Sequence, residues 1–545
     1  MIVDLNQPNE REAREYDVCI VGSGPAGGTL AAELAGSGLA VCVLESGKQR
    51  FTKFADELKA TRSEGIHIKD YSRERMLGGS STTWAGLSSP LDPIDMAPRP
   101  FLRKSGWPIA RDELLPLYEE AAERYRFPTV DFFEPTGFGA LRAKGDVQPA
   151  WDTIDEKIFL ACDEPQDFGK EQRHVYADGG VDLFLDASVL RFETDAGAVR
   201  SVAIKTSNGR EVSLRARAFV AATGGIENAR LLLNSDVGNE SDQVGRYLMN
   251  HPKNYHGILH LAKPAEDTPY YFGCLYKGFA GYAGLRLRTD LQLERELMNT
   301  YVRLEPLFPW SDSEGVEALV LIAKRSLFVL RAFKRGRKDE VVDLRDYSET
   351  GDDSDLSNER KSFFQWLGLV GTILGDLPKV TRYAISRLRR RSKPKITRVR
   401  LRNFMEMEPH PDNRVMLADE RDAHGQRIPL VKHVPTARDK RTLVELHADL
   451  VREFDATGVG RLETSLDATD PWPIDQDASH HMGTTRMGTD PSDSVVDTDC
   501  RVHGTTNLYM AGASVFPTSG CANPTFTIVA LSIRLARHLR QELSA

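Results

Sequence analysis

The fold is decided by the stretch YDVCIVGSGPAGGTLAAELAGSGLAVCVLESG, which covers residues 16–47. It begins with an apolar run, residues 17–21, of the kind that forms a buried parallel strand. The glycine turn Gly22-Ser23-Gly24-Pro25-Ala26-Gly27 follows, and an alanine-rich segment then predicts a helix over residues 26–37. A second apolar run, residues 40–44, predicts another strand that ends at Glu45. The order of strand, glycine turn, helix and strand predicts a βαβ unit.

The glycines and the acid of this unit predict a bound dinucleotide. Gly22 permits the tight turn, Gly24 lets the backbone approach a pyrophosphate, and Gly27 lets the helix pack on the strand. Glu45 lies about twenty residues beyond the glycines, where a carboxylate accepts hydrogen bonds from the hydroxyls of an adenosine ribose. A carboxylate there disfavours NADP, because it would repel the 2′-phosphate. The unit therefore predicts a Rossmann-like domain that binds FAD or NAD.

Composition sets the broad class of protein. A chain of 545 residues suggests two or more domains, and a net charge of −8 gives no reason to expect a nucleic-acid partner. The six cysteines are scattered without a CxxC pair, which argues against a metal site or a disulfide framework. The first fifteen residues are polar and acidic, unlike a signal peptide. No apolar run reaches the ~18 residues of a membrane span. We therefore expect a cytoplasmic enzyme without a metal.

Two further segments favour FAD over NAD. Residues 217–222 predict a core strand that runs into Thr223-Gly224-Gly225 and then into a helix over residues 226–233. Such a small, glycine-rich strand end suits a nucleotide packed against the first turn. Residues 76–84, MLGGSSTTW, form a second loop rich in glycine and serine, here called the Gly/Ser loop. This loop either crosses a phosphate or a flavin ring or is an ordinary surface turn.

Three segments together resemble the glucose–methanol–choline (GMC) family of FAD-dependent oxidoreductases. They are the N-terminal unit, residues 75–81 and the C-terminal run 480–526; ATGGIENARLLL from Ala222 and VGRYLMNHP from Val244 are similar to the family as well. The C-terminal pattern looks nearest to pyranose oxidases and related bacterial sugar oxidoreductases.

The resemblance implies an α/β fold with two domains. The Rossmann-like FAD-binding domain is discontinuous and takes residues 1–100, 182–254 and 478–545. The second, α+β substrate domain takes residues 101–181 and 255–477 and is built on a largely antiparallel sheet. Within it, residues 257–287 and 299–307 are rich in aromatic residues and glycine, which predicts strands over the flavin.

The resemblance also implies the catalytic pair. The family's H-x-x-G-T pattern falls on His480, which would act as the base, and its partner position, forty-three residues on, is Asn523. A neutral imidazole can take the proton of an alcohol near neutral pH, and an amide can hold the substrate oxygen. Without the resemblance, His480 would more often be a structural histidine. The role of His481 stays open between packing and the substrate pocket.

The expected cofactor contacts follow the same motifs. Besides Gly22, Gly24, Gly27 and Glu45, they are Gly79, Ser80, Thr83, Gly512, Ala513, Pro524 and Thr525. Some family members attach FAD through a histidine in the Gly/Ser loop, and that position here is Thr83. Threonine cannot form a histidyl–flavin bond, so we expect non-covalent FAD. Pro524 and Thr525 begin the last helix, whose N-terminus can stabilise negative charge on the reduced flavin.

These expectations combine into a function with alternatives. The chain is expected to oxidise a primary or secondary alcohol of a small-molecule sugar, glycoside or polyol. Hydride would pass to flavin N5, and the electrons would then pass to oxygen, a quinone or a protein. The alternatives are a dehydrogenase of a non-sugar alcohol in natural-product metabolism and a catalytically silent flavoprotein that serves as a binding module. A flavin- and NADH-dependent reductase would need a second glycine-turn unit, and none is found.

An insert around residues 320–400 has an unusual charge pattern. An acidic patch, residues 339–355, precedes an apolar segment, residues 363–377, and an acid-free basic run, residues 382–402. The pattern predicts an apolar helix followed by a basic one. Such a pair would make a weak membrane-surface contact through residues 363–402 or dock an electron-accepting partner. The alternative is a lid or surface helix pair whose charges are merely solvated.

Overall fold

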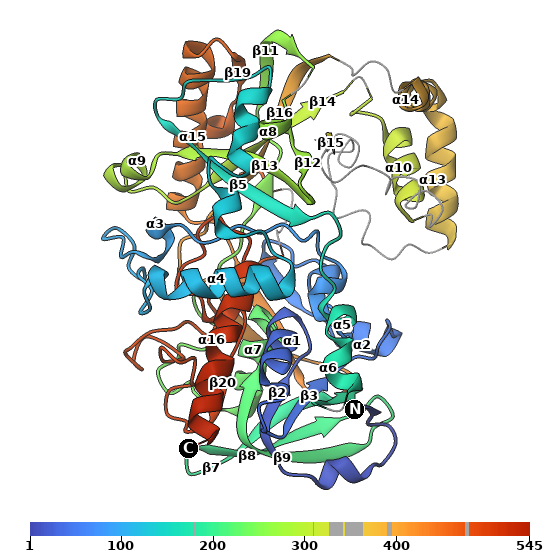
Figure 1. The fold of residues 1–545 in the computed structure, drawn as a ribbon, viewed down its shortest axis with the longest axis vertical. Helices are drawn as coiled ribbons and strands as arrows, with labels where there is room; N and C mark the ends of the chain where they lie inside the picture. Colours follow the sequence, from blue (N-terminus) through green and yellow to red (C-terminus); the bar gives the residue numbers. More distant parts are fainter. Residues whose placement is uncertain are drawn as a thin grey trace.

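The computed structural model of the protein describes residues 1–178, 180–266, 268–308, 310–325, 342–343, 363–389, 395–474 and 479–544. Its elements gather around two large sheets. In Figure 1 one sheet lies in the lower half, beside both chain termini, and the other lies in the upper half. Most of the acidic patch, residues 339–341 and 344–355, and residues 390–394 of the basic run lie outside the described residues.

The lower sheet carries the predicted βαβ unit. Its order is β1 (Ile2–Asp4), β6 (Asp182–Leu185), β3 (Val41–Glu45), β2 (Tyr16–Val21), β9 (Glu211–Ala221), β8 (Ala198–Lys205) and β7 (Ser188–Asp195), with β20 (Leu508–Met510) also on β9. Strand β2 pairs in parallel with β3 and β9 and is almost wholly buried, as its continuous apolar run predicts. The strands β7, β8 and β9 form an antiparallel meander.

Helices join the strands of this sheet and bring the motifs to one edge. Helix α1 (Pro25–Leu34) begins directly at the glycine turn and ends earlier than predicted, and α7 (Gly225–Ser235) follows β9. The C-terminal helix α16 (Thr525–Ser544) packs along α1. The carboxyl ends of the parallel strands β2, β9 and β20 therefore lie together, next to the first residues of α1, α7 and α16. This edge is where an open α/β sheet binds ligands.

The upper sheet is antiparallel in every pair that the structure describes. Its order is β15 (Val342–Asp343), β12 (Cys274–Tyr276), β13 (Phe279–Leu287), β14 (Tyr301–Leu307), β16 (Ile396–Phe404), β11 (Ile258–Ala265) and β19 (Gly460–Glu463); β5 (Ile154–Cys162) joins β13 and β10 (Lys253–Asn254) joins β16. Helix α15 (Ala437–Ala456) packs against this sheet (Figure 1). The predicted fold class, a Rossmann-like α/β unit with a largely antiparallel second sheet, is confirmed.

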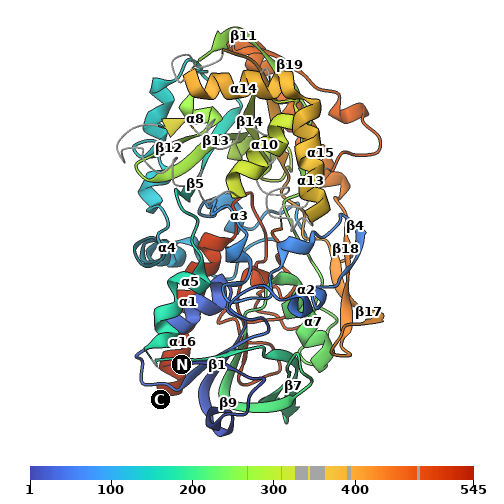
Figure 2. The ribbon, with the colours of Figure 1, turned by 90° about the vertical axis from the view of Figure 1, so that its right-hand side faces the viewer.

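The remaining elements lie outside the two large sheets. A small sheet joins β17 (Arg414–Arg421), β18 (Arg427–His433) and β4 (Arg62–Gly65), and Figure 2 shows it along one side of the molecule. The other helices are α2 (Lys53–Glu57), α3 (Pro93–Met96), α4 (Arg111–Tyr125), α5 (Phe168–Glu171), α6 (Arg173–Ala177), α8 (Pro269–Phe272) and α9 (Thr289–Glu294).

The insert contains helices α10 (Glu314–Arg325), α13 (Phe363–Gly375) and α14 (Leu377–Arg389), which lie together on one side of the upper sheet (Figure 1). The prediction of a basic helix through residue 402 is wrong, because residues 396–404 form strand β16. The side chains of Val399 and Leu401 are fully buried there and alternate with arginines, which is the period of a strand. Among the described helices, none combines the length and apolar character that a membrane crossing requires.

Candidate active site

A cavity of about 960 Å³ lies where the two sheets meet, at the upper end of the range of about 300–1,000 Å³ for small-molecule sites. The glycine turn, the Gly/Ser loop and the end of β9 line it from below, and β13, β14 and β16 line it from above. The structure brings the predicted site residues together here. All of them except Gly27 line the cavity: Gly22, Gly24, Glu45, Gly79, Ser80, Thr83, His480, Gly512, Ala513, Asn523, Pro524 and Thr525.

The glycine turn has the geometry that a pyrophosphate needs. Gly22 has a φ of +101°, and a Cβ there would lie 2.6 Å from the carbonyl oxygen of Ala222. A Cβ on Gly27 would lie 1.9 Å from the carbonyl oxygen of Gly22, so this glycine serves helix packing and not the cavity. Gly24 differs, because the nearest heavy atom to an added Cβ is 4.0 Å away. A side chain at Gly24 would therefore fill cavity space that a phosphate can take.

Glu45 is held by donors at the end of β3. Its carboxylate accepts hydrogen bonds from the backbone N–H of Ser23 (3.2 Å), the Ser23 hydroxyl (2.6 Å) and the backbone N–H of Gly47 (2.8 Å). Burial raises the pKa of Glu45 despite these donors. The Ser23 hydroxyl also accepts from the N–H of Gly78 (3.2 Å), so it joins the acid to the Gly/Ser loop. Sequence reasoning missed this serine.

The Gly/Ser loop lies directly against the glycine turn. It folds as the 3-10 helix Gly79–Thr82, and a Cβ on Gly79 would lie 3.0 Å from the Cα of Gly24. Thr83 follows, and its hydroxyl donates to the carbonyl oxygens of Ser80 (3.3 Å) and Tyr71 (3.4 Å). The loop is therefore not an isolated surface turn. It forms one wall of the cavity.

The start of α16 completes the lower wall. Pro524 and Thr525 line the cavity, and the N–H of Ile528 donates to the Pro524 carbonyl (2.9 Å) in the first turn of the helix. The preceding amides of this turn have no acceptor within the helix, so the positive end of its dipole lies at the cavity. An open glycine turn, a ribose-type carboxylate and a helix N-terminus are together the chemistry that FAD needs, so these residues fit that cofactor.

His480 and Asn523 are hydrogen-bonded to each other, although they are far apart in sequence. Asn523 Nδ2 lies 3.3 Å from Nε2 of His480. On the other side of the same ring, Nδ1 of His480 lies 3.0 Å from Nδ1 of His251. The backbone N–H of His480 donates to the side-chain oxygen of Asn250 (3.1 Å). The imidazole of His480 is thus held from both ends.

The chain of partners selects one tautomer of His480. Nε2 of His251 lies 2.8 Å from the carbonyl oxygen of Gly520, which can only accept, so this nitrogen carries the proton. In neutral His251, Nδ1 is then an acceptor, and His480 must donate to it from Nδ1. Nε2 of neutral His480 is left with a lone pair, next to the Asn523 amide. The geometry therefore leaves a proton acceptor at the nitrogen that faces Asn523.

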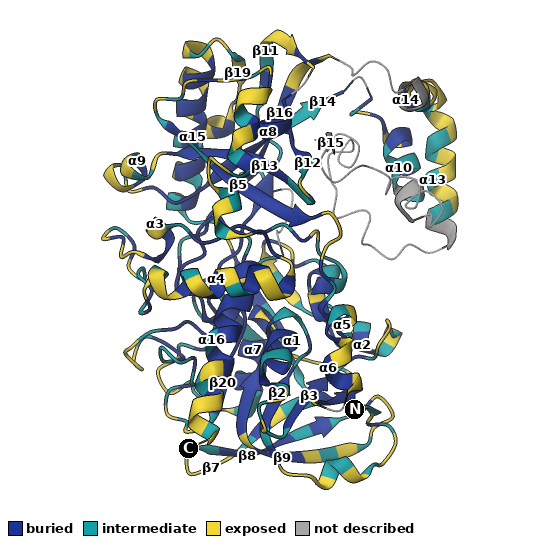
Figure 3. Cartoon of the chain, in the orientation of Figure 1, coloured by how far each residue is buried: buried dark blue, intermediate teal, exposed yellow. Residues whose placement is uncertain are grey.

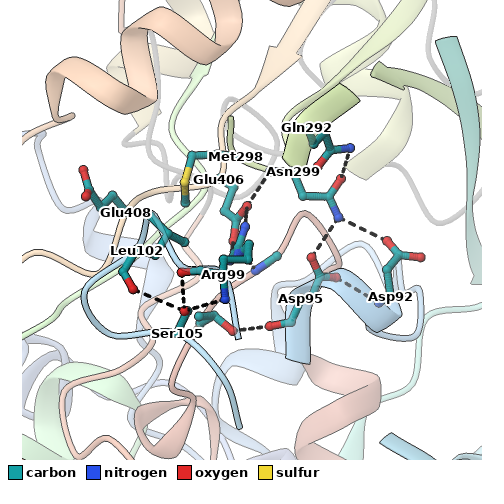
Figure 4. A network of polar contacts seen from close by, with 12 residues as sticks. Asp92, Asp95, Arg99, Leu102, Ser105, Gln292, Met298, Asn299, Glu406 and Glu408 are labelled. Carbon is teal, nitrogen blue, oxygen red and sulfur yellow. Dashed lines mark hydrogen bonds and ion pairs between the residues drawn. The ribbon is translucent and has the colours of Figure 1, made fainter. Parts of the chain in front are cut away.

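A buried ion pair, drawn in Figure 4, holds the peptide of Gly520 that contacts His251. Arg99 donates two hydrogen bonds to Glu406, from Nη1 (2.9 Å) and Nη2 (2.7 Å), and both side chains are fully buried. Glu406 also accepts from the N–H of Gly520 (3.1 Å), whose carbonyl holds His251. Burial alone would raise the pKa of Glu406, but Arg99 and its other partners keep it below its usual value. The ionised Glu406 therefore fixes the peptide that orients His251.

The carboxyl group of Asp95 lies next to Gly520. A Cβ on Gly520, whose φ is +55°, would come within 2.4 Å of the Asp95 carboxyl group. Asp95 accepts from Asn299 (2.8 Å), as Figure 4 shows, and burial together with the charge of Asp92 raises its pKa to about 6. Sequence reasoning missed this network, because its members have no motif of their own. Of its members, His251 lay within the family-like stretch 244–252 and Gly520 within the family-like run 480–526, but neither was singled out.

His481 lies against the start of α7. A Cβ on Gly225 would lie 2.1 Å from the carbonyl oxygen of His481, so this residue packs against the start of α7. It is also part of the cavity lining. Within the described residues, no group of three or more histidine, cysteine or acidic side chains is placed to hold a metal ion.

The upper wall is aromatic and basic. Tyr282, Phe404, Arg303, Arg402 and Lys253 line it, from β13, β16, β14 and β10. The rings of Tyr301 and Phe404 stack with centroids 4.7 Å apart and planes 2° apart. Strands β11, β12, β13 and β14 are present over residues 257–287 and 299–307 as predicted, and of these β12, β13 and β14 line the cavity.

Comparisons with known proteins agree with this geometry. Residues 409–532 match the family described as GMC oxidoreductase, and residues 15–68 match the family described as FAD binding domain. Paromamine 6′-oxidase of Streptomyces fradiae is 24% identical over 97% of this chain and 92% of its own length. C-glycoside 3-oxidase of Arthrobacter globiformis is 36% identical over 23% of each chain.

A solved structure has the same fold. The crystal structure of pyridoxine 4-oxidase superposes with a TM-score of 0.54 at 16% identity, over 96% of this chain and 99% of that one. The likeness therefore extends through both sheets. The cavity geometry, the two matched families and the full-length relatives together show a GMC oxidoreductase domain and an FAD-binding domain in this chain.

Proposed function

We propose that this enzyme oxidises a primary or secondary alcohol group of a sugar, glycoside or polyol. The observation that carries the proposal is the hydrogen-bonded chain from Gly520 through His251 and His480 to Asn523, which leaves a proton acceptor in the cavity. Two relatives are named as oxidases of paromamine and of C-glycosides, and these names support a sugar-bearing substrate.

The residues act as follows. Nε2 of His480 accepts the proton of the substrate hydroxyl, and the amide of Asn523 donates a hydrogen bond to the same oxygen. Positioned general bases contribute about 10²–10⁴-fold to a rate. His251 holds the ring of His480 in the tautomer that this step needs. FAD, when bound, supplies the acceptor for the hydride that leaves the alcohol carbon.

The experiment for this proposal is anaerobic mixing of the holoenzyme with a panel of sugars, glycosides and polyols, followed by flavin absorbance. Loss of the oxidised flavin spectrum with at least one of them is expected. A flavin that stays oxidised with every sugar but is reduced by simple non-sugar alcohols would favour the alternative dehydrogenase. A flavin that stays oxidised throughout would favour the binding module. Aerobic turnover with oxygen, a quinone or a redox protein then identifies the electron acceptor.

FAD is held without a covalent bond in this proposal, because Thr83 occupies the loop position that lines the cavity. Precipitation of the protein in acid should release all of the flavin into the supernatant. Flavin that stays with the precipitated protein would contradict the proposal.

Two proposals concern the surroundings of the enzyme. The first is a weak membrane-surface contact through the insert, where Leu367, Val370 and Leu374 of α13 are 53%, 46% and 66% exposed, beside the basic helix α14 (Figure 3). Vesicles with anionic lipid should sediment the wild type at low salt but not Leu374→Asp; equal sedimentation would contradict this.

The second proposal is a cytoplasmic location, supported by six free and buried cysteines. Cell fractionation tests it.

A further inference from the structure

The wall of the cavity opposite the glycine turn carries an unusual set of charges. On β14 the side chains of Tyr301, Arg303 and Glu305 alternate along one face. The register of the sheet places Phe404, Arg402 and Arg400 of β16 directly opposite these three residues, in that order. Two arginines therefore face each other across the strands at the middle position. Like charges directly opposite each other destabilise a sheet, so this pair of arginines needs an explanation.

Glu305 is an acid that lies among these arginines. It accepts hydrogen bonds from Arg400 (3.0 Å) and Arg402 (3.3 Å), whereas Arg303 lies 3.8 Å away. Burial would raise the pKa of Glu305, but the neighbouring arginines hold it below its usual value. The carboxylate of Glu305 thus forms ion pairs with three guanidinium groups, and the one with Arg303 is the longest, at 3.8 Å. Lys253, opposite Phe404 on β10, adds another cation to the wall.

Arg303 is the least satisfied of these groups. Its side chain is only 9% exposed and lines the cavity, yet within the described residues it donates no hydrogen bond, and its buried Nε has no acceptor. Its guanidinium lies 4.2 Å from the ring centroid of Tyr282. A guanidinium that stacks on a ring keeps its N–H donors at the edges, where they can pair with an anion. Burying a charge without hydrogen bonds costs free energy unless a ligand supplies the missing acceptor.

This wall lies beside the catalytic pair. Lys253 is two residues after His251, which is hydrogen-bonded to His480. Cys521, two residues before Asn523, packs in one cluster with Tyr282 and Tyr301. The ring of Tyr282, on which Arg303 stacks, therefore belongs to the same packed cluster as the segment that contains Asn523. A substrate whose hydroxyl reaches His480 can place another of its groups against Arg303.

We propose that Arg303, assisted by Arg402, binds an anionic group of the substrate, so that the enzyme selects acidic sugars or glycosides over neutral ones. The shared chemistry is an oxyanion, carried as a carboxylate or as a phosphate, which an arginine can bind with two parallel hydrogen bonds. This inference rests on the proposed function and narrows its substrate class.

The experiment measures equilibrium binding of four ligands to the holoenzyme by calorimetry: glucose, glucuronate, glucose 6-phosphate and glucosamine. At least one of the two anionic sugars is expected to bind about ten-fold or more tightly than glucose, as charge-assisted hydrogen bonds allow. Glucosamine, which is cationic, should bind most weakly. The preference should decrease as salt is raised. Glucuronate and glucose 6-phosphate distinguish a carboxylate from a phosphate substrate.

Variants assign the preference to this wall. Arg303→Gln should remove most of the difference between anionic and neutral sugars, and Arg303→Lys should keep part of it, because the charge remains while the planar fork is lost. Arg191→Gln, on the exposed face of β7, is the matched control and should leave the preference unchanged. Equal binding of glucose and both anionic sugars to the wild type would overturn the proposal, and this arm needs no variant to fold.

Three further outcomes are separable. If the arginines served the reduced flavin instead, Arg303→Gln would lower the flavin reduction potential and leave the order of ligand affinities unchanged, which would overturn the inference. If anionic sugars bind preferentially but no alcohol reduces the flavin, the proposed oxidation fails while the anion site stands. If neutral sugars alone reduce the flavin, the oxidation stands and the anion site fails.

Discussion

The most informative perturbation of the site is a pair of substitutions at His251. The amide group of asparagine superposes on the Nδ1 side of a histidine ring, and that of glutamine superposes on the Nε2 side. His251→Asn therefore keeps an acceptor for Nδ1–H of His480 and loses the bond to Gly520. His251→Gln keeps the bond to the Gly520 carbonyl and loses the acceptor. The two variants separate the two halves of the chain of 3.0 Å and 2.8 Å contacts.

The expected effects differ in size. In His251→Gln the Nδ1–H of His480 loses its partner, and an unsatisfied buried donor costs about 1–3 kcal/mol. The tautomer with the proton on Nε2 then becomes competitive, and that tautomer cannot accept the substrate proton. If the whole cost appears in the transition state, flavin reduction slows about 5- to 150-fold. In His251→Asn only the bond to Gly520 is lost, so the rate should stay within about ten-fold of wild type.

The assay is the anaerobic rate of flavin reduction across a range of substrate concentrations. We expect the limiting rate to fall in His251→Gln while the half-saturating concentration changes little, because His251 orients the base and does not hold the substrate. His260→Gln, on the exposed side of β11, is the control and should behave like wild type. Equal rates in both His251 variants, or a wild-type rate in His251→Gln, would refute the reasoning.

Three other predictions follow from the structure. Gly24→Val should lose FAD but keep the fold, because its side chain would enter the open cavity, and the ratio of flavin to protein with circular dichroism checks this. Arg99→Met should lower the free energy of unfolding by about 3–5 kcal/mol in urea titrations, because it leaves the buried Glu406 carboxylate unpaired. Burial raises the pKa of Asp439 to about 8, so folded protein keeps a proton that unfolded chain has lost. Stability relative to Asp439→Asn should therefore fall as pH rises from about 4 to 8 and then level off; a pH-independent difference would contradict this.

The parts of the fold that sequence could predict are the local ones. The β2–α1–β3 unit is continuous, so its apolar runs and glycines predict both the elements and the dinucleotide site. The aromatic strands of the upper sheet are local patterns too, and the structure contains them. The helix prediction for the residues of strand β16 was wrong because it was based on the charge of the run. The alternation of Val399 and Leu401 with arginines, which indicates a strand, was not considered.

The parts of the site that sequence could not predict depend on contacts between distant residues. His251 and His480 are 229 positions apart, and Arg99 and Glu406 are 307 apart. No local period links such residues, because they meet only after both sheets have formed. The arginines of β14 and β16 likewise come together only through the register of the two strands. A histidine beside an asparagine in a family-like segment was the one signal that pointed toward the support of His480.

The central claim is that His480 is the base of an FAD-dependent alcohol oxidation. Its most direct test is the anaerobic rate of flavin reduction in His480→Ala, with a substrate that reduces the wild-type flavin. The account predicts a variant that keeps its FAD and its ability to bind the substrate but loses at least about 10²-fold in rate, the contribution of a positioned base. Flavin reduction at the wild-type rate in this FAD-loaded variant would contradict the account.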